Sequence, residues 1–319
     1  MRYLISFLFL STISLSFAQE LSDYGLQGQV KTVTRHLKNS SFGQSVTRMN
    51  FDKKGKMTER IHYKGEMELD YRELYSYDKK GHLVEQITEY PNGKNTKRTW
   101  SYSPTGKMLG WKVQNEAGKV EQEGVKKYNE QEQEIEFILT DYAYQGENTM
   151  VESYLYTYKY DEQGKRIEER SYGANGSLER VHLSEYDPAG NEILRTDSSY
   201  TYHSARVTKN KYDSKNRLIE TKNFDNGKFN LHQKMSYDEQ GNQTQVVYFD
   251  SNGNETKKIV RSYDERNNET GYETFQKDDS QKYKYDISNT YDEHQNVISY
   301  EMSQWGKVTK SYQAEIIYY

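Results

Sequence analysis

The sequence predicts an all-β protein, an antiparallel array of β-hairpin repeats that forms a twisted or coiled ribbon, or an open solenoid-like sheet. Three observations predict this class: a repeat period of about 26 residues, strand-like alternation between turns, and no helical period of comparable strength. The 319 residues include 31 tyrosines and only 3 prolines. This composition suits strands whose faces carry amphipathic rings.

The repeat is marked by an aromatic anchor followed by Asp or a similar small polar residue. In most copies Gly or Asn stands three positions after that polar residue. Asp bonds the backbone ahead of it, and Gly supplies the positive φ that closes a turn. Ten anchors, 25 to 32 residues apart, are Phe51, Tyr77, Tyr102, Tyr128, Tyr160, Tyr186, Tyr212, Tyr237, Tyr263 and Tyr291. We expect about ten repeats of ~26 residues.

The residues between the anchors read as strands. Nine of the ten residues that stand seven positions after an anchor are β-branched, as strands favour. A second turn signal, such as Pro91-Asn92-Gly93 or Ser251-Asn252-Gly253, lies midway through most repeats. Each repeat therefore predicts two strands of about 7 to 9 residues, or about 20 strands in all. The first and last strands would be exposed edges.

The register of each hairpin depends on the length of its turn. A four-residue Asp-x-x-Gly loop places the residue at +7 opposite the apolar residue at −2, relative to the anchor. A three-residue loop places it opposite the polar residue at −1. Matching apolar with apolar favours the four-residue loop, with the anchor and +7 on one better-buried face. In this register Trp100 faces Leu109, Trp111 faces Arg98, and all four share the face that carries Tyr102.

The chain divides into a leader, a cap and a single repeat domain. Residues 1–18 predict a secretory signal peptide, because Arg2 precedes an apolar stretch that ends in Ser16-Phe17-Ala18. Residues 19–50 are expected to form a starting strand or cap, and residues 51–319 the array. Extra residues after Tyr128 predict a longer loop at 141–148. The remaining chain has no apolar stretch long enough for a transmembrane helix.

The repeats resemble the YD-repeat (RHS-like) family. The resemblance rests on Tyr-Asp-x-x-Gly-Asn followed by a β-branched residue, as in residues 186–193 and 237–244, and covers roughly residues 45–315. It implies a continuous ribbon of antiparallel strands that coils, as RHS shells do around a toxin. The period is longer than the typical repeat of that family. We expect an exported member without a toxin domain.

Composition and motifs argue against several classes of function. A formal net charge of −4 does not suit a polybasic surface for nucleic acid. The sequence has no phosphate loop and no hydrolase or zinc-protease motif. The seven histidines show no spacing typical of a metal site. We therefore expect no catalytic residue, no metal and no cofactor. The absence of cysteine in an exported chain favours a bacterial periplasm or exterior.

Aromatic side chains are the candidate ligand-binding residues. The candidates are Trp100, Trp111, Trp305, Tyr142 and Tyr144. Their rings could stack on sugars, or they could simply thicken the buried face of a thin sheet. We expect a non-enzymatic exported binding or scaffold protein of the bacterial envelope, with a surface polysaccharide or a protein as partner. The alternatives are a glycoside-cleaving enzyme, since carboxylates are abundant, and an outer-membrane-associated β protein. The oligomeric state stays open.

Overall fold

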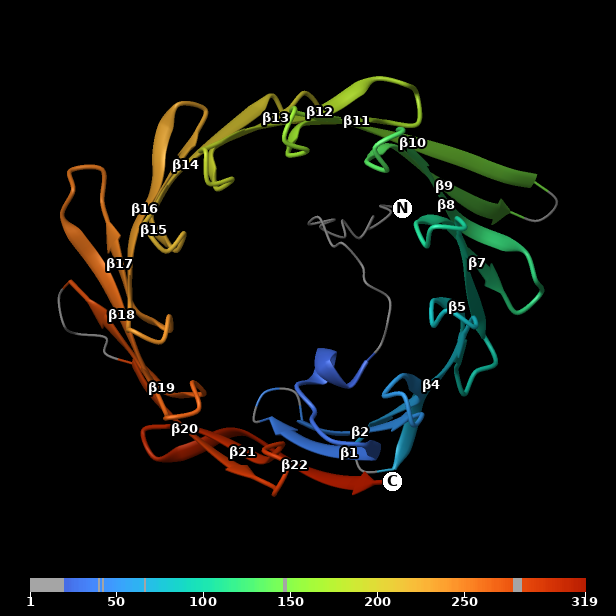
Figure 1. The fold of residues 1–319 in the computed structure, drawn as a ribbon, viewed down its shortest axis with the longest axis horizontal. Helices are drawn as coiled ribbons and strands as arrows, with labels where there is room; N and C mark the ends of the chain where they lie inside the picture. Colours follow the sequence, from blue (N-terminus) through green and yellow to red (C-terminus); the bar gives the residue numbers. More distant parts are fainter. Residues whose placement is uncertain (1–19, 40, 42, 66, 146–147, 278–282) are drawn as a thin grey trace.

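The computed structural model describes residues 20–319 except 40, 42, 66, 146–147 and 278–282 (Figure 1). The signal peptide expected at 1–18 lies outside the described residues. One 3₁₀-helix, η1 (Leu21–Tyr24), precedes 22 strands. Among the described residues, no helix is long and apolar enough to cross a membrane.

The strands follow one another along the chain with short connections. The first eleven are β1 (Val30–Asn39), β2 (Gly43–Phe51), β3 (Met57–Lys64), β4 (Glu68–Tyr77), β5 (Leu83–Glu89), β6 (Thr96–Tyr102), β7 (Met108–Asn115), β8 (Val120–Tyr128), β9 (Glu134–Gln145), β10 (Asn148–Tyr160) and β11 (Arg166–Tyr172). The second eleven are β12 (Leu178–Tyr186), β13 (Glu192–Ser199), β14 (Ser204–Tyr212), β15 (Leu218–Asp225), β16 (Lys228–Tyr237), β17 (Gln243–Phe249), β18 (Glu255–Tyr263), β19 (Glu269–Gln276), β20 (Tyr283–Tyr291), β21 (Val297–Gln304) and β22 (Lys307–Tyr318).

All 22 strands belong to one closed antiparallel barrel (Figure 1). Each strand pairs with its neighbours in sequence, and β1 also pairs with β22, from Val30 opposite Tyr318 to Asn39 opposite Lys310. The expected open ribbon with exposed terminal strands is therefore wrong. Closure depends on small twists summed over every repeat, and no local sequence pattern records that sum. At about 4.8 Å between strands, such a ring has a backbone diameter of at least ~34 Å.

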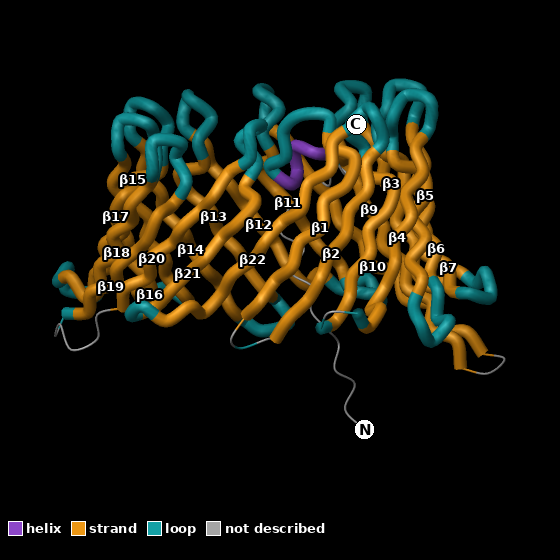
Figure 2. The backbone as a smooth tube through the Cα atoms, turned by 90° about the horizontal axis from the view of Figure 1, so that it is seen from below, coloured by secondary structure: helices purple, strands orange, loops and turns teal. Residues whose placement is uncertain are grey.

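The antiparallel order sorts the turns into two sets at opposite ends of the barrel (Figure 2). The turns that follow the anchors form the Asp-turn end, where η1 and the C-terminus also lie. The second turns of the repeats form the other end, which we call the tip end. Around most of the ring the Asp turns curl toward the middle and the tip-end hairpins lean outward (Figure 1).

The Asp turns are tighter than expected and are followed by a β-bulge. The Asp78 N–H donates to the His82 carbonyl, so three residues separate this closing pair. Tyr77 then pairs with Leu83 and Ser76 with Glu85, which leaves the +7 residue between them without a partner in the register. The same shift follows all ten anchors. The expected four-residue register is therefore wrong.

The anchor tyrosines join neighbouring hairpins through their hydroxyl groups. Each of eight successive hydroxyls donates to the backbone carbonyl six residues after the preceding anchor, as Tyr186 does to Arg166 at 2.9 Å. The eight donors are Tyr77, Tyr102, Tyr128, Tyr160, Tyr186, Tyr212, Tyr237 and Tyr263. Tyr291 departs from the series, because its hydroxyl donates to the Asp264 carboxylate at 3.2 Å. The hydroxyls form a ladder beside the bulges at the Asp-turn end.

The face that carries the anchors lines the inside of the barrel. The segment that contains η1 lies inside the ring (Figure 1), and Leu26 packs with Phe51 and Met57 in the main buried cluster. Because side chains alternate along a strand, the anchor, −2 and −4 positions face inward and −1 and −3 face outward. The +7 residues were expected on the better-buried face. This is wrong for Leu109 and Ile135, which are 40% and 38% exposed.

The two chain ends build an eleventh repeat together. Tyr318 takes the place of an anchor and Val30 the place of its +6 residue: the two pair, and a register shift follows them as in the other repeats. The Tyr319 N–H donates to the Gln29 carbonyl at 3.0 Å, as the first turn residue does elsewhere. The buried Asn296 side chain holds both backbone groups of Gln27, at 2.6 and 3.0 Å. Thus β22 is the anchor strand of a repeat whose second strand is β1.

Candidate functional site on the inner wall

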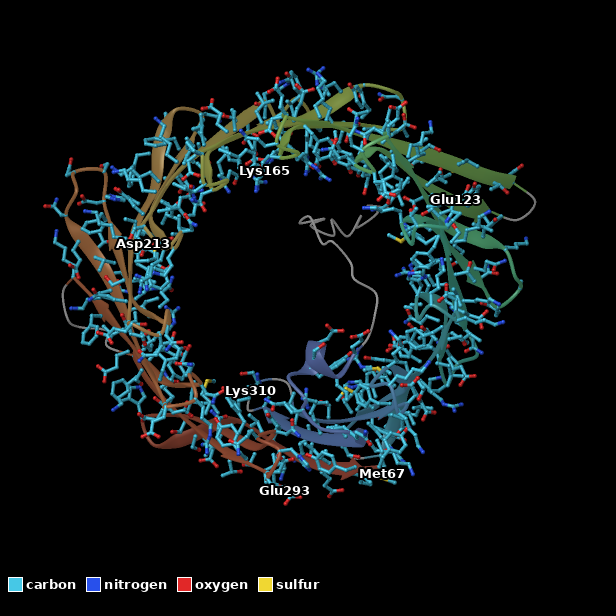
Figure 3. All side chains as sticks on the ribbon, in the orientation of Figure 1. Met67, Glu123, Lys165, Asp213, Glu293 and Lys310 are labelled. Carbon is cyan, nitrogen blue, oxygen red and sulfur yellow. The ribbon has the colours of Figure 1, made fainter. Side chains whose placement is uncertain are left out.

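Aromatic side chains recur around the inner wall of the barrel, where Figure 3 shows side chains bordering an open middle. Trp100 and Trp111 lie directly opposite each other on β6 and β7. Further ring contacts on this face join Phe137 with Tyr156 at 5.6 Å, Tyr272 with Tyr285 at 4.6 Å, and Tyr300 with Tyr312 at 5.7 Å between centroids. The rings come from strands spread along the whole chain. They therefore give the inner wall repeated flat apolar faces.

Cationic side chains lie over several of these rings. The Arg166 guanidinium is 3.9 Å from the Tyr158 ring centroid, and that of Arg98 is 5.3 Å from the Trp111 centroid. Burial lowers the pKa of Arg98. Such pairs hold the ring and the cation in fixed positions by a cation–π attraction. Rings beside hydrogen-bond donors are the combination that binds sugars or other flat polar groups.

A pocket of about 570 Å³ lies on the same face between β18, β19 and β20. The stacked rings of Tyr272 and Tyr285 form part of its wall, together with Lys257 and Arg261. The Arg261 guanidinium donates to the Gln243 side chain at 2.9 Å and lies 3.7 Å from a Glu269 carboxylate oxygen. The pocket thus combines an apolar platform with charged groups of both signs.

A polar cluster on the inner wall joins β12 and β13. His182 Nδ1 lies 2.7 Å from Asp197 Oδ1 and His182 Nε2 lies 3.0 Å from Ser184 Oγ, which donates to Glu192 at 2.5 Å. Burial opposes the imidazolium charge, yet hydrogen bonds with Asp197 and Glu192 outweigh it and raise the pKa of His182 to about 9. An imidazolium cannot take a proton from Ser184. The cluster therefore has the connectivity of a hydrolase triad without its charge state.

The outer wall carries rows of ion pairs beside partly exposed apolar side chains. Lysines at −1 pair with glutamates at +8 directly across the hairpin, as Lys159 does with Glu168 at 2.8 Å and Lys211 with Glu220 at 2.7 Å. Lys127 repeats this arrangement with Glu136 at 2.5 Å. Rows of ion pairs of this kind suit contact with water.

The predicted ligand-binding residues do not converge on one site. Trp100 and Trp111 share the inner wall but face each other, so the expected pairs with Leu109 and Arg98 are wrong. The bulge moves Trp111 by two positions relative to the expected register, and Arg98 pairs with Val113.

The other three candidates lie elsewhere. Tyr142 and Tyr144 are on the outer face of β9, where their hydroxyls donate to Glu123 and to the Val120 carbonyl, at 2.7 and 2.6 Å. Trp305 lies in the β21–β22 turn at the tip end and is largely exposed.

The extra residues after Tyr128 lengthen strands instead of forming the expected loop. Residues 141–145 belong to β9 and pair with residues 148–152 of β10. The longer hairpin extends beyond its neighbours at the tip end (Figure 1). Tyr142 pairs with Val151 and Tyr144 with Thr149, and such aromatic–β-branched cross-strand pairs favour continued pairing over a loop.

Sequence reasoning missed several inner-wall residues, chiefly Arg98, Tyr156 and His182. All three stand at −4 from an anchor. Counting back in steps of two from each anchor assigns them to the anchor face. That this face encloses a lumen follows only from closure of the barrel.

Comparisons with known proteins give limited matches. Residues 32–121 match a family described as "Uncharacterised protein". No curated protein matches the chain.

Among solved structures, the chain is similar to the Photorhabdus luminescens Tc holotoxin pore, with 12% identity and a TM-score of 0.35, covering 85% of this chain and 20% of that one. A TcdB2-TccC3-Cdc42 structure matches with 12% identity and a TM-score of 0.35, over 83% and 19%. A porin-like protein from Bacteroides uniformis matches with 11% identity and a TM-score of 0.31, over 90% and 98%. The chain thus spans about a fifth of the Tc toxin chains, and the YD-repeat resemblance rests on the sequence motif.

Proposed function

We propose that this chain is a non-enzymatic exported binding protein of the bacterial envelope, and that its inner wall binds a polysaccharide. Export rests on the leader predicted at residues 1–18. A periplasmic or extracellular place follows from the same leader and from the absence of cysteine.

The observation that carries this proposal is the set of aromatic rings around the inner wall. Rings such as Trp111, Tyr156 and Tyr285 lie on the face that borders the open middle of the barrel, and several have an arginine or lysine against them. Sugar rings present flat C–H faces that stack on aromatic side chains, while their hydroxyls bond to neighbouring polar groups. Regular spacing from strand to strand suits a chain of repeating units.

The width of the barrel supports an extended ligand. Strand spacing sets a backbone diameter of at least ~34 Å, and inward side chains and the η1 segment fill part of it. A small molecule would touch one sector of such a wall. A polymer chain can run along several repeats at once and gain from many weak contacts.

Cleavage of glycosides is the rival function, and the inner-wall acids do not favour it. A glycosidase needs one protonated carboxyl group near a second, ionised one. Despite burial, hydrogen bonds with His182 and Arg195 lower the pKa of Asp197 to about 2, and the His182 bond also lowers the pKa of Glu192. Hydrogen bonds thus favour the ionised forms of Asp197 and Glu192, which does not suit a general acid.

The proposal is tested by affinity electrophoresis of residues 19–319 in gels containing xylan, dextran, mannan or alginate, followed by product analysis. We expect retardation by at least one polymer without released oligosaccharides. Trp111→Ala and Tyr272→Ala should weaken retardation severalfold, because each removes an inner-wall ring. Thermal melting of each variant separates lost binding from lost folding.

Tyr142→Ala is the matched control, since it removes a hydrogen-bonded ring from the outer wall. Equal loss of binding in this control would overturn the inner-wall site. Turnover abolished by one Asp or Glu substitution would replace the proposal with an enzyme. Retention of an envelope protein in a pull-down, with no polysaccharide bound, would replace the glycan with a protein partner.

A further inference from the structure

Exposed apolar side chains gather at one end of the barrel. Among the described residues, seven large apolar side chains are more than half exposed, and six of them lie at the tip end. These six, which we call the apolar rim, are Met67, Met150, Val151, Tyr200, Tyr202 and Trp305, with exposures from 52% to 85%. The seventh, Ile317, is close to the C-terminus at the Asp-turn end.

The apolar rim is distributed around the ring and not gathered in one patch. Its members lie at or beside the β3–β4, β9–β10, β13–β14 and β21–β22 turns. These turns are separated by four to eight strands along the closed sheet. Since all tip-end turns lie at the same end of the barrel (Figure 2), the apolar rim marks several separate points of one broad ring.

The Asp turns differ in composition. They consist mainly of polar residues and Gly, because most of these turns have Asp or Asn at their start and Gly or Asn at their close. The tip-end turns share no such pattern, and the β13–β14 turn carries Tyr200 and Tyr202 where most other tip-end turns contain Gly. Folding of the hairpin therefore does not explain these exposed rings.

From this asymmetry we propose that the apolar rim docks the barrel on the surface of a lipid bilayer, with the barrel standing on its tip end. Trp and Tyr are the side chains that favour the interface between lipid and water, and Met and Val can enter the acyl boundary. A protein partner would have to match several points spread over a ring at least ~34 Å wide, whereas a bilayer offers the same apolar layer at each point.

The remaining surface limits how far the barrel can enter the bilayer. The outer wall carries ion pairs such as Lys159–Glu168 and Lys211–Glu220, which lipid cannot solvate. Lysines such as Lys307 next to the rim can meet lipid phosphates while Trp305 enters the interface. The combination fits shallow docking of the turns and not a membrane-spanning barrel. This proposal is independent of the glycan proposed for the inner wall.

The test uses residues 19–319 with vesicles of phosphatidylcholine and phosphatidylglycerol at about three to one. Trp305 is a natural probe, because Trp100 is buried and Trp111 is half-buried on the inner wall. We expect co-sedimentation with the vesicles, and quenching of Trp305 emission by brominated lipid. Trp305→Phe should lose that quenched component and retain most of the binding.

A variant that combines Tyr200→Ser, Tyr202→Ser and Trp305→Ser should reduce the vesicle-bound fraction by about tenfold with unchanged thermal melting. Ile317→Ser, at an equally exposed site on the opposite end, should bind as the parent does. Absence of vesicle binding, or equal binding by the triple variant, would overturn the proposal. Concentration-dependent self-association that the triple variant abolishes, without vesicle binding, would assign the rim to a second copy of the chain and also overturn it.

Discussion

A single hydroxyl group distinguishes the anchor tyrosines from any other large ring at the same position. The ring packs on the inner wall, while the hydroxyl reaches the preceding hairpin and donates to a carbonyl beside its bulge. A bulge interrupts the regular ladder, so a side-chain donor replaces part of the lost pairing. Phe51 occupies the first anchor position without a hydroxyl, next to the repeat that the chain ends share.

Separating ring from hydroxyl gives the first prediction. Tyr186→Phe should lower the free energy of unfolding by ~1 kcal/mol, because the Arg166 carbonyl loses its donor. Tyr186→Ala should lower it by ~3 kcal/mol, since packing is lost as well. Glu162→Ala, in an exposed turn, should cost ~0.5 kcal/mol or less. Urea unfolding measures all three, and equal small losses would show that the anchor ring contributes little packing.

The second prediction concerns pH and His182. Its pKa is raised from 6.5 to about 9, so the folded state binds the proton more tightly than the unfolded state. The resulting stability is fully present below about pH 6.5 and is lost as the pH rises through about 9. The shift corresponds to about 3 kcal/mol, which screening by water at this partly exposed site reduces to the order of 2 kcal/mol.

The comparison is the change in melting temperature between about pH 6 and pH 9.5 for the parent and His182→Gln. We expect a smaller fall in the variant, because a glutamine has no charge to lose. An identical fall in both proteins would show that other groups account for the alkaline destabilisation.

At the level of strands and turns, local chemistry was enough to predict most of the array. Each anchor ends its strand, and each Asp-x-x-Gly or Asp-x-x-Asn signal marks a turn, as at Tyr160 and Tyr212. Both signals depend on a few adjacent residues, so they can be recognised without tertiary context. Low helix content follows from the same pattern.

The register could not be predicted in this way. Residues in a bulge and residues paired in a strand are both often β-branched. Ile167 and Ile219, which lie at +7 in bulges, therefore cannot be told from paired residues by their type. The error displaced the partners of Trp100 and Trp111 even though their shared face was predicted. Residues such as His182 gain their partners from a neighbouring strand, and only the true register identifies Asp197 as one of them.

Closure is a property of the whole molecule. The pairing of β1 with β22 joins segments from the two ends of the chain, and it exists only because every intervening repeat twists by the right amount. A slightly different twist would leave the same hairpins in an open ribbon. The repeat pattern therefore predicted the strands and turns that form the wall, but it did not predict the enclosed lumen or the candidate binding surface that lines it.

An engineered disulfide across the seam between β1 and β22 tests closure of the barrel. Thr34 and Glu315 are direct partners on β1 and β22, and the chain has no native cysteine. Thr34→Cys with Glu315→Cys should oxidise to a crosslink, shift mobility on a non-reducing gel and stabilise the barrel by about 4 kcal/mol. Thr34→Cys with Lys209→Cys, on a strand across the barrel, should stay reduced. Failure of the seam pair to crosslink, or equal crosslinking of both pairs, would contradict closure.

The eleventh repeat, shared by β22 and β1, bears on how a barrel of this kind can change calibre during evolution. Tyr319 and Gln29 are hydrogen-bonded as the closing pair of an Asp turn is, so three residues that link them would complete another such turn. A circularly permuted chain could then begin at any tip-end turn. Duplication of one 26-residue unit would add two strands and about 3 Å of diameter without a new kind of contact. The number of repeats in the gene would then set the barrel diameter, and a single unequal crossover could change that number by one.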